Sequence, residues 1–203
     1  MKNDSFSPAP EANPAALPLS VPVCGDELRA LRAGDRVLLS GIVYTARDQA
    51  HARMAQCIAS GEALPFELNG SAIYYVGPTP ERPGHIIGSA GPTTSGRMDA
   101  FSPLLFDRGN KIVIGKGLRN KEVIASIVKN GAVYLGAPGG AGALLSSCIT
   151  SCEVIAWPDL GCEAVRRLEV KDLPLTVIID TTGNDLYSSG PEEYLRSLAA
   201  DAV

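Results

Sequence analysis

The stretch "DRVLLSGIVYTARDQAHARMAQCIASG" (residues 35–61) contains an expected strand followed directly by an expected helix. Residues 35–46 are mostly apolar and rich in β-branched side chains, which is typical of a buried strand. Small and apolar side chains, including Ala50 and Met54, then recur at helical spacing until Gly61, a residue type that commonly ends a helix. The stretch therefore predicts one strand–helix unit of a layered α/β fold.

The alternation of strands and helices continues along most of the chain. Further strands are expected at residues 71–77, 85–91, 111–117, 132–138, 153–158 and 174–180. Further helices are expected at residues 120–131, in a glycine-rich segment at 139–149, at 163–170, and from about Pro191 to the end. This order favours an α/β fold over a sandwich or a helical bundle.

Length and composition fit one domain with a core. The chain has 203 residues, of which 45% are hydrophobic, and this length suits a single domain. The beginning is rich in Pro, Ala, Ser and Asn, so we expect residues 1–18 to be a flexible segment and residues 19–203 to be a single domain.

Charge and cysteine content narrow the function classes. A net charge of −4 without a basic stripe argues against nucleic-acid binding. No apolar run approaches the roughly 18 residues that a membrane-spanning helix needs, so we expect no membrane association. The five cysteines lack disulfide-like spacing and no secretion signal is recognisable, which predicts a reducing cytoplasm as the compartment.

Three expected strands end next to a basic side chain. Arg47 follows the strand at 35–46, Arg97 lies in "AGPTTSGRMDAF" (90–101), and Lys116 lies between two glycines. Ligands of α/β sheets gather beyond the carboxyl ends of strands, and arginine grips a carboxylate with two parallel hydrogen bonds. The pattern predicts a pocket for a small polyanion, most simply a carboxylate.

Plainer interpretations of the same residues stay open. Arg97 could be a surface side chain in an ordinary strand-to-helix connection, and Arg47 could form a salt bridge to Asp48 or another acid.

Thr94 or Ser95 could cap the helix that follows, leaving free N–H groups near Arg97 to bind an anion. Thr45 is expected to cap the helix after residue 46 in the same way, while Met98 and Phe101 are expected to face inward.

Several familiar motifs are absent or incomplete. The segment before Lys116 lacks P-loop spacing, and "GAPGGAG" (136–142) lacks dinucleotide-binding spacing, so a tight turn with close packing is expected there. Cys148 and Cys152 are expected to be buried thiols on one face of a helix. His51 is expected to pack or hydrogen-bond rather than to catalyse, and "DTTGND" (180–185) is expected to form a turn.

Six motifs in a fixed order resemble those of a known family. They are "SGIVYTARDQAHAR", "IGSAGPTTSGRMD", "IGKG", "GAPGGAGALL", "WPDLGCEAV" and "IIDTTGNDLY". Together they resemble the C-terminal, or beta, part of the iron–sulfur (class I) fumarate hydratase and L-tartrate dehydratase family. The resemblance covers roughly residues 25–187, and "GPTTSGRMD" is its most specific motif.

This resemblance implies a fold and a reaction. The expected fold is a swivelling β/β/α domain, with a mixed sheet and helices packed around it. The expected activity is that of a carbon–oxygen hydro-lyase that reversibly hydrates fumarate to malate. An L(+)-tartrate dehydratase beta subunit, converting tartrate to oxaloacetate, is the alternative within the family. A non-catalytic carboxylate-binding module is the alternative of a different class.

The resemblance also implies roles for single residues. Thr93 corresponds to the threonine proposed as catalytic base in the family. The expected substrate-binding residues are Arg47, Thr94, Ser95, Gly96, Arg97 and Lys116. No metal ligand is expected in this chain, because it lacks the cluster-binding half of a complete enzyme. A separate alpha subunit is expected to carry the [4Fe–4S] cluster, and the beta chain alone is expected to be inactive and to assemble as a homodimer or a heterotetramer.

Overall fold

One mixed sheet organises residues 16–200, the part of the chain that the computed structural model describes. Within this part, the sheet has the strand order β1-β2-β3-β4-β5-β7-β6. The strands are β1 (Leu17–Val21), β2 (Arg36–Thr45), β3 (Ala72–Tyr74), β4 (Ile112–Gly115), β5 (Val133–Gly136), β6 (Ile149–Ala156) and β7 (Val165–Ile179). Strands β1 to β5 pair in parallel, whereas β7 pairs antiparallel with β5, β6 and β2.

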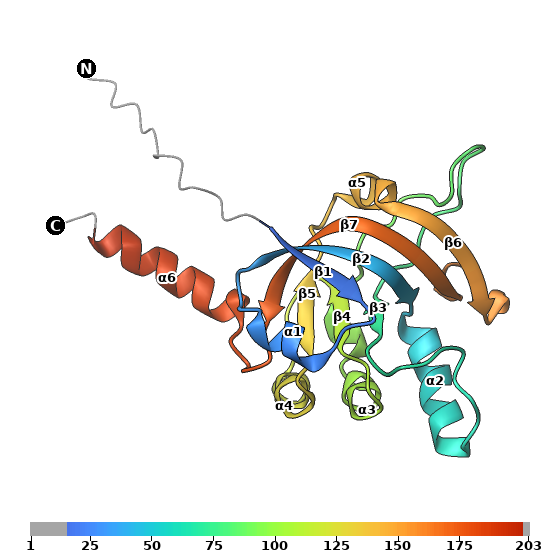
Figure 1. Cartoon of the computed structure of the whole chain (residues 1–203), viewed down its shortest axis with the longest axis horizontal. Helices are drawn as coiled ribbons and strands as arrows, with labels where there is room; N and C mark the ends of the chain where they lie inside the picture. Colours follow the sequence, from blue (N-terminus) through green and yellow to red (C-terminus); the bar gives the residue numbers. More distant parts are fainter. Residues whose placement is uncertain (1–15, 201–203) are drawn as a thin grey trace.

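The pairing of β7 with β2 divides the strands into two layers. Because β2 contacts β3 along one edge and β7 along the other, the hydrogen-bonded strands β2, β3, β4, β5 and β7 form a closed circuit. Figure 1 shows β7 and β6 arching above β3, β4 and β5, with helices below. The order strand layer, strand layer, helix layer confirms the expected α/β class and the β/β/α arrangement.

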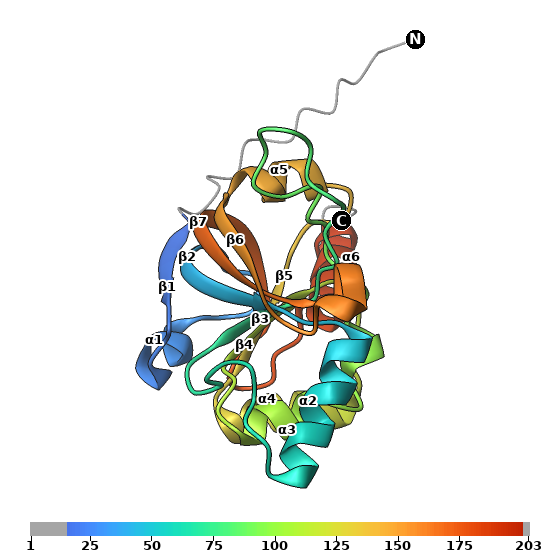
Figure 2. The same ribbon diagram turned by 90° about the vertical axis from the view of Figure 1, so that its right-hand side faces the viewer.

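Six α-helices and two short 3₁₀ helices are found among the described residues. The α-helices are α1 (Gly25–Ala30), α2 (Asp48–Ser60), α3 (Ser102–Asp107), α4 (Lys121–Asn130), α5 (Gly142–Ser147) and α6 (Leu186–Ala200). The 3₁₀ helices are η1 (Ser95–Met98) and η2 (Pro158–Glu163). Helices α2, α3 and α4 cover the lower face of the strands, and α6 projects away from the body (Figures 1 and 2). No described helix has the length and apolarity required to cross a bilayer.

Alternating side chains of the central strands build two hydrophobic cores. Ile112 and Ile114 point into the core between the strand layers. Val113 points into the core between the strands and helices α2, α3 and α4. The same alternation places Tyr74 in the first core and Tyr75 in the second. These strands read as continuous apolar runs because both of their faces are buried.

Helices α2 and α4 form where the sequence predicts them. The side chain of Asn120 accepts a hydrogen bond from Val123 N–H at 2.8 Å and caps α4. Gly131 and Gly61 end α4 and α2 in the left-handed conformation, with φ of 57° and 74°. Glycine adopts this conformation without the steric cost of a Cβ atom.

Three secondary-structure predictions were wrong. Residues 85–91 form a loop, whose base is closed by hydrogen bonds between Thr79 and Ser89. Residues 163–170, expected as a helix, belong mostly to β7, because pairing with β2 and β6 overrides a weak helical spacing. Helix α6 begins at Leu186 and contains Pro191 in its interior.

Other expectations have mixed outcomes. Residues 1–15 of the segment expected to be flexible lie outside the described residues, but Leu17 and Pro18 already belong to β1. Cys148 ends α5 and Cys152 lies in β6, so they do not share a helix face, although both partly buried side chains pack on the first core. The turn after β7 is confirmed, since Asp180 accepts hydrogen bonds from Thr182 and Asn184.

Candidate functional site

The segment Pro92–Met98 lies across the carboxyl ends of β3 and β4. Thr93 N–H donates to Tyr75 O at 2.7 Å, and Ser95 N–H donates to Lys116 O at 2.8 Å. Thr94 and Lys116 also form an isolated parallel bridge. The chain therefore brings Thr93, Thr94 and Lys116 to one edge of the sheet. Lys116 follows β4 as expected, whereas a loop at residues 85–91, rather than the expected strand, precedes the two threonines.

The N–H groups at this turn are less available than expected. Those of Thr93 and Ser95 are already bonded to backbone carbonyls. The helix that follows is the four-residue η1, and Thr94 makes no side-chain cap. Basic side chains rather than a helix N-terminus therefore supply the positive charge of this edge.

Arg97 projects from η1 toward the start of α2. Its Nε donates to Asp48 Oδ1 at 2.9 Å, and its Nη2 lies 2.7 Å from Asp48 Oδ2. The side chain of Arg97 remains 49% exposed. Asp48 is the first residue of α2, where a carboxylate is favoured by the helix dipole.

Arg47 lies beside this pair, at the N-cap of α2. Its Nη2 is 3.7 Å from Glu163 Oε1, so the salt-bridge interpretation is correct, with Glu163 as the partner rather than Asp48. Glu163 Oε2 also accepts a hydrogen bond from Gln49 N–H at 2.9 Å. Gly77 packs so closely on Arg47 that a side chain there would collide with the guanidinium. The carboxylate of Glu163 and the close packing of Gly77 thus fix the guanidinium of Arg47.

Thr45 has a different role from the expected helix cap. Its buried Oγ1 donates to Ala164 O at 3.2 Å and accepts from Arg166 N–H at 2.9 Å. These two bonds join the end of β2 to the start of β7. The hydroxyl therefore fixes the strand from which Arg47 emerges.

Lys116 lies next to the glycine-rich turn after β5. A Cβ atom placed on Gly139 would lie 3.9 Å from Lys116 Nζ. Further along the turn, Gly142 packs against Ser89 and Gly91, and Ala90 N–H donates to Gly142 O at 3.0 Å. The expectation of a tight turn with close packing is confirmed for this segment.

A buried polar layer beneath the turn was missed by the sequence reading. The side chain of Arg119 is fully buried and lies over the rings of Tyr75 and Tyr134, 5.4 and 5.3 Å from their centroids. Its Nε donates to Asp99 Oδ1 at 2.7 Å, and its Nη2 donates to Ser102 Oγ at 2.7 Å. Asp99 belongs to the "SGRMD" motif, so Arg119 fixes this motif from below.

Ser95 belongs to the same layer. Its Oγ is buried and lies 3.0 Å from Tyr134 Oη, and the tyrosine hydroxyl donates to Gly117 O at 2.9 Å. Burial raises the pKa of Tyr134, so its hydroxyl stays protonated. This geometry favours an anchoring role for Ser95 over the direct substrate contact that the resemblance implies.

His51 lies on the buried face of α2. Its ring packs edge-on against Tyr75, 5.3 Å between centroids, and Nδ1 is 2.9 Å from Arg47 O. Burial lowers the pKa of His51 to about 4, so the ring is neutral at pH 7 and donates from Nδ1 to the carbonyl. The expected packing and hydrogen-bonding role agrees with this position. Met98 is buried as expected, while Phe101 is half-buried.

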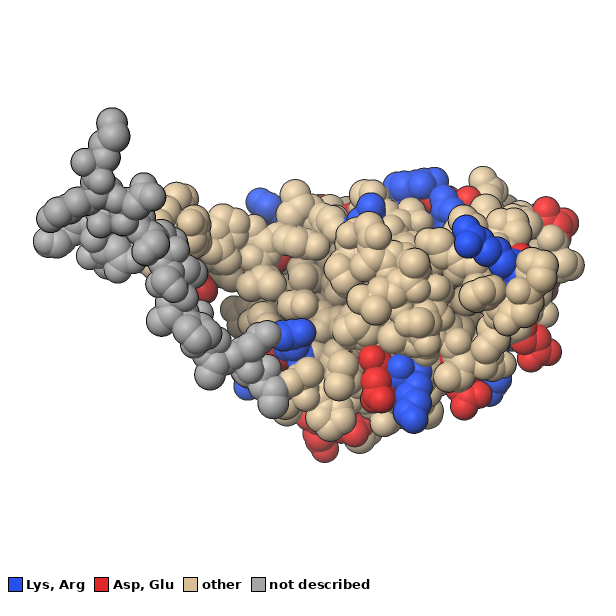
Figure 3. Space-filling view, turned by 90° about the horizontal axis from the view of Figure 1, so that it is seen from above, with Lys and Arg blue, Asp and Glu red and all other residues tan. Residues whose placement is uncertain are grey.

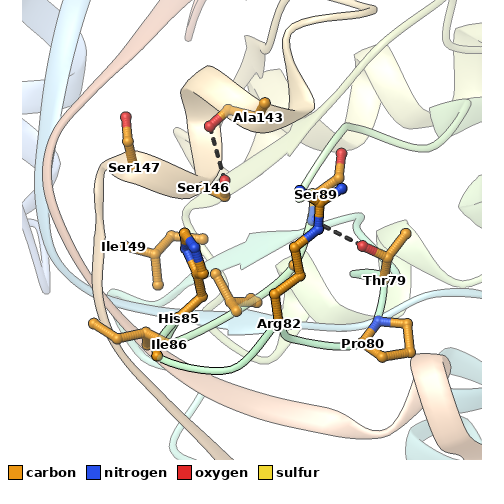
Figure 4. A pocket seen from close by; sticks show the side chains of 13 residues that line it. Thr79, Pro80, Arg82, His85, Ile86, Ser89, Ala143, Ser146, Ser147 and Ile149 are labelled. Atoms are coloured by element: carbon orange, nitrogen blue, oxygen red, sulfur yellow. Dashed lines mark hydrogen bonds between the residues drawn. The ribbon is translucent and has the colours of Figure 1, made fainter.

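One hollow of about 490 Å³ lies between the loop at 79–89 and α5. Figure 4 shows Arg82, His85 and Ser146 at its wall. None of the seven residues singled out from the sequence lines it.

Metal ligands do not gather in the part of the chain that the structure describes. Within residues 16–200, no group of three or more His, Cys, Asp or Glu side chains could hold a metal ion. All five cysteines are free thiols. These residues do not fit the thiolate set that holds an iron–sulfur cluster.

Surface charge is scattered on the face above the strands. Figure 3 shows basic side chains interspersed with acidic ones around a broad uncharged area. On this face the basic groups do not form a stripe of the kind that follows a nucleic-acid backbone.

The two layers of strands and the layer of helices define the class of the protein as a layered α/β domain with a mixed sheet. The family described as Fumarase C-terminus matches residues 3–190, and the chain belongs to this family. The resemblance seen in the sequence motifs is thereby confirmed.

Relatives fall into two groups by length. The chain is 42% identical over 164 residues to fumarate hydratase 2 of Leishmania major and 40% identical over 154 residues to the anaerobic class I fumarate hydratase of Escherichia coli. These matches cover 80% and 75% of this chain but only 29% and 28% of those relatives. The chain is also 40% identical over 167 residues to a Methanocaldococcus jannaschii protein named "Putative L(+)-tartrate dehydratase subunit beta", covering 79% of this chain and 86% of that relative.

Proposed function

We propose that this chain is the beta subunit of a two-subunit hydro-lyase that reversibly hydrates fumarate to malate. The observation that carries the proposal is the position of Thr93, Thr94 and Lys116 at one sheet edge, with Arg97 in the 3₁₀ turn that follows, in a chain of the Fumarase C-terminus family. The relative named as a subunit beta matches over 86% of its length, which supports a separately encoded partner.

Three cations of this chain bind the dicarboxylate in the proposed site. Arg47 and Arg97 suit carboxylates because their planar groups match the two oxygens. Lys116 adds a point charge on the neighbouring strand end. Fixed cations of this kind stabilise the negative charge that develops on a carboxylate as the adjacent C–H bond breaks.

Thr93 is the proposed base that removes the C3 proton of malate. Its backbone is held by Tyr75 O, which keeps the side chain at the edge with Lys116. A threonine hydroxyl is a weak base, and nearby positive charge lowers its pKa by stabilising the alkoxide. Thr94 and Gly96 complete the turn around the substrate, while Ser95 anchors it.

The alpha subunit provides what these residues lack. Loss of hydroxide from C2 of malate requires a Lewis acid, and we assign that role to a [4Fe–4S] cluster carried by the alpha chain. The beta chain then contributes substrate orientation and proton transfer. A homodimer of beta chains within a heterotetramer is compatible with this division.

Reconstitution tests the proposal. The chain is combined anaerobically with a candidate alpha-type chain, iron and sulfide, and fumarate absorbance is followed. Malate, L(+)-tartrate and methylated analogues are assayed in parallel. Turnover of fumarate and malate is the expected result, whereas preferential turnover of tartrate assigns the chain to the tartrate dehydratase alternative, which the relative of similar length favours. Binding of dicarboxylates without any turnover would instead support a non-catalytic module.

A further inference from the structure

One edge of the Arg97 guanidinium is occupied by a carboxylate of this chain. Asp48 engages Nε and Nη2, at 2.9 and 2.7 Å. A guanidinium has a second edge, formed by Nη1 and Nη2, that can grip another carboxylate with two hydrogen bonds. Among residues 16–200, no hydrogen bond to Nη1 of Arg97 is found. One arginine can therefore hold Asp48 and a ligand carboxylate at once.

Asp48 is itself firmly placed by the backbone. It begins α2 directly after the N-cap residue Arg47. The next residue, Gln49, donates its N–H to Glu163 Oε2 at 2.9 Å, so η2 pins the first turn of the helix. A second contact between the same elements, Arg53 with Asp159, lies further along α2. The carboxylate thus offers Arg97 a fixed point on a rigid element.

The pair between Asp48 and Arg97 is too exposed to matter greatly for stability. Their side chains are 26% and 49% exposed, and exposed ion pairs contribute roughly 0–1 kcal/mol. Its larger effect is on orientation, because an unpaired arginine side chain samples many rotamers. Holding the Nε edge removes most of this freedom before any ligand arrives.

We propose that Asp48 is a positioning residue, which orients Arg97 so that its Nη1–Nη2 edge faces a substrate carboxylate. This inference rests on the proposed function. Asp48 and Glu163 also offset two of the three positive charges of Arg47, Arg97 and Lys116. If Asp48 only reduced the positive charge of the site or competed with the substrate, its removal would tighten substrate binding. If Asp48 positions Arg97, its removal weakens substrate binding.

The orientation is tested first in the isolated chain. With ¹⁵N-labelled arginine, the Nε–H signal of Arg97 is assigned by its absence in Arg97→Lys, and its exchange with water is measured. Exchange is expected to accelerate at least about 10-fold in Asp48→Ala and less in Asp48→Asn, which keeps one acceptor oxygen. Asp159→Asn is the matched control, because it removes the acidic partner of Arg53 on the same helix. An unchanged Arg97 signal in Asp48→Ala overturns the inference.

The kinetic consequence is tested in the reconstituted pair of chains. Asp48→Ala is expected to lower kcat/KM for malate by about 10- to 100-fold, the scale of a small misplacement of a substrate-holding group. Asp48→Asn should recover part of the loss, and Asp159→Asn should stay within about twofold of the native chain. A lower KM with unchanged kcat in both Asp48 variants overturns the positioning role.

Failure of the proposed function would give a different result. A native pair without activity on any dicarboxylate refutes the hydro-lyase assignment and the substrate-facing part of the inference. Slow Nε–H exchange that depends on Asp48 would still establish that Asp48 orients Arg97. The two outcomes are therefore read from independent measurements.

Discussion

Replacing Arg119 by Met should destabilise the fold and displace the Pro92–Met98 turn. The substitution removes a guanidinium whose side chain is fully buried, together with its bonds to Asp99 and Ser102. It leaves Asp99, only 11% exposed, with the N–H of Asn120 at 2.8 Å as a remaining donor. Removing one member of a buried ion pair costs about 3–5 kcal/mol, because the other charge loses its partner.

Thermal and urea unfolding measure this effect. For a domain of this size, about 3–5 kcal/mol corresponds to a decrease in Tm of roughly 6–20 °C. Lys129→Met is the matched control, since it also removes a basic partner of an aspartate, but from a pair with side chains 68% and 44% exposed. The control should lose no more than about 1 kcal/mol.

The double variant Arg119→Met, Asp99→Asn separates the ion pair from simple packing. Removing both charges should recover part of the lost stability, because no carboxylate is left buried without its cation. A loss below about 1 kcal/mol in Arg119→Met would refute the claim that this buried cation supports the turn. An equal loss in Lys129→Met would refute it as well.

Further predictions concern catalysis and pH. Arg97→Ala should abolish most turnover of the reconstituted pair and leave the Tm nearly unchanged, because the side chain is 49% exposed. A native kcat/KM would contradict the role of Arg97 in substrate binding. Arg53→Ala, which removes an arginine of α2, serves as the control. Thr93→Val should stop proton exchange at C3 of malate, measured by deuterium incorporation, and retained exchange would place the base elsewhere. Burial lowers the pKa of His51 from 6.5 to about 4. Between about pH 6.5 and pH 4 only the unfolded state gains a proton on this ring, so the free energy of unfolding should fall as the pH decreases over that range. The full decrease is about 3 kcal/mol. Urea unfolding at pH 7 and pH 4.5 should show this decrease in the native chain and a smaller one in His51→Phe, and equal decreases would count against the assignment.

The sequence predicted the parts of the fold that depend on local patterns. Helix α4 follows from apolar spacing, a capping Asn120 and a terminal Gly131. Strands β4 and β5 follow from short continuous apolar runs. The positions of Arg47 and Lys116 directly after β2 and β4 followed from the apolar pattern of those strands, whereas Arg97 lies in η1 and is not preceded by the strand expected at residues 85–91.

The remaining features depend on contacts between distant residues. The assignment of Val165–Val170 to a strand follows from pairing with β2 and β6, which no local pattern encodes. The partner of Arg47 is Glu163, which lies more than a hundred residues along the chain. Arg119 looked like one more basic residue, because nothing local shows that a side chain will be enclosed by Tyr75, Tyr134 and Asp99.

The central claim is that this chain supplies one half of a shared active site. It is tested most directly by titrating the chain into a fixed amount of the cluster-loaded alpha chain and measuring the rate of fumarate hydration. We expect no turnover by either chain alone and a rate that rises until the two chains are equimolar. Full activity of the alpha chain alone, or no activity at any ratio, would contradict it.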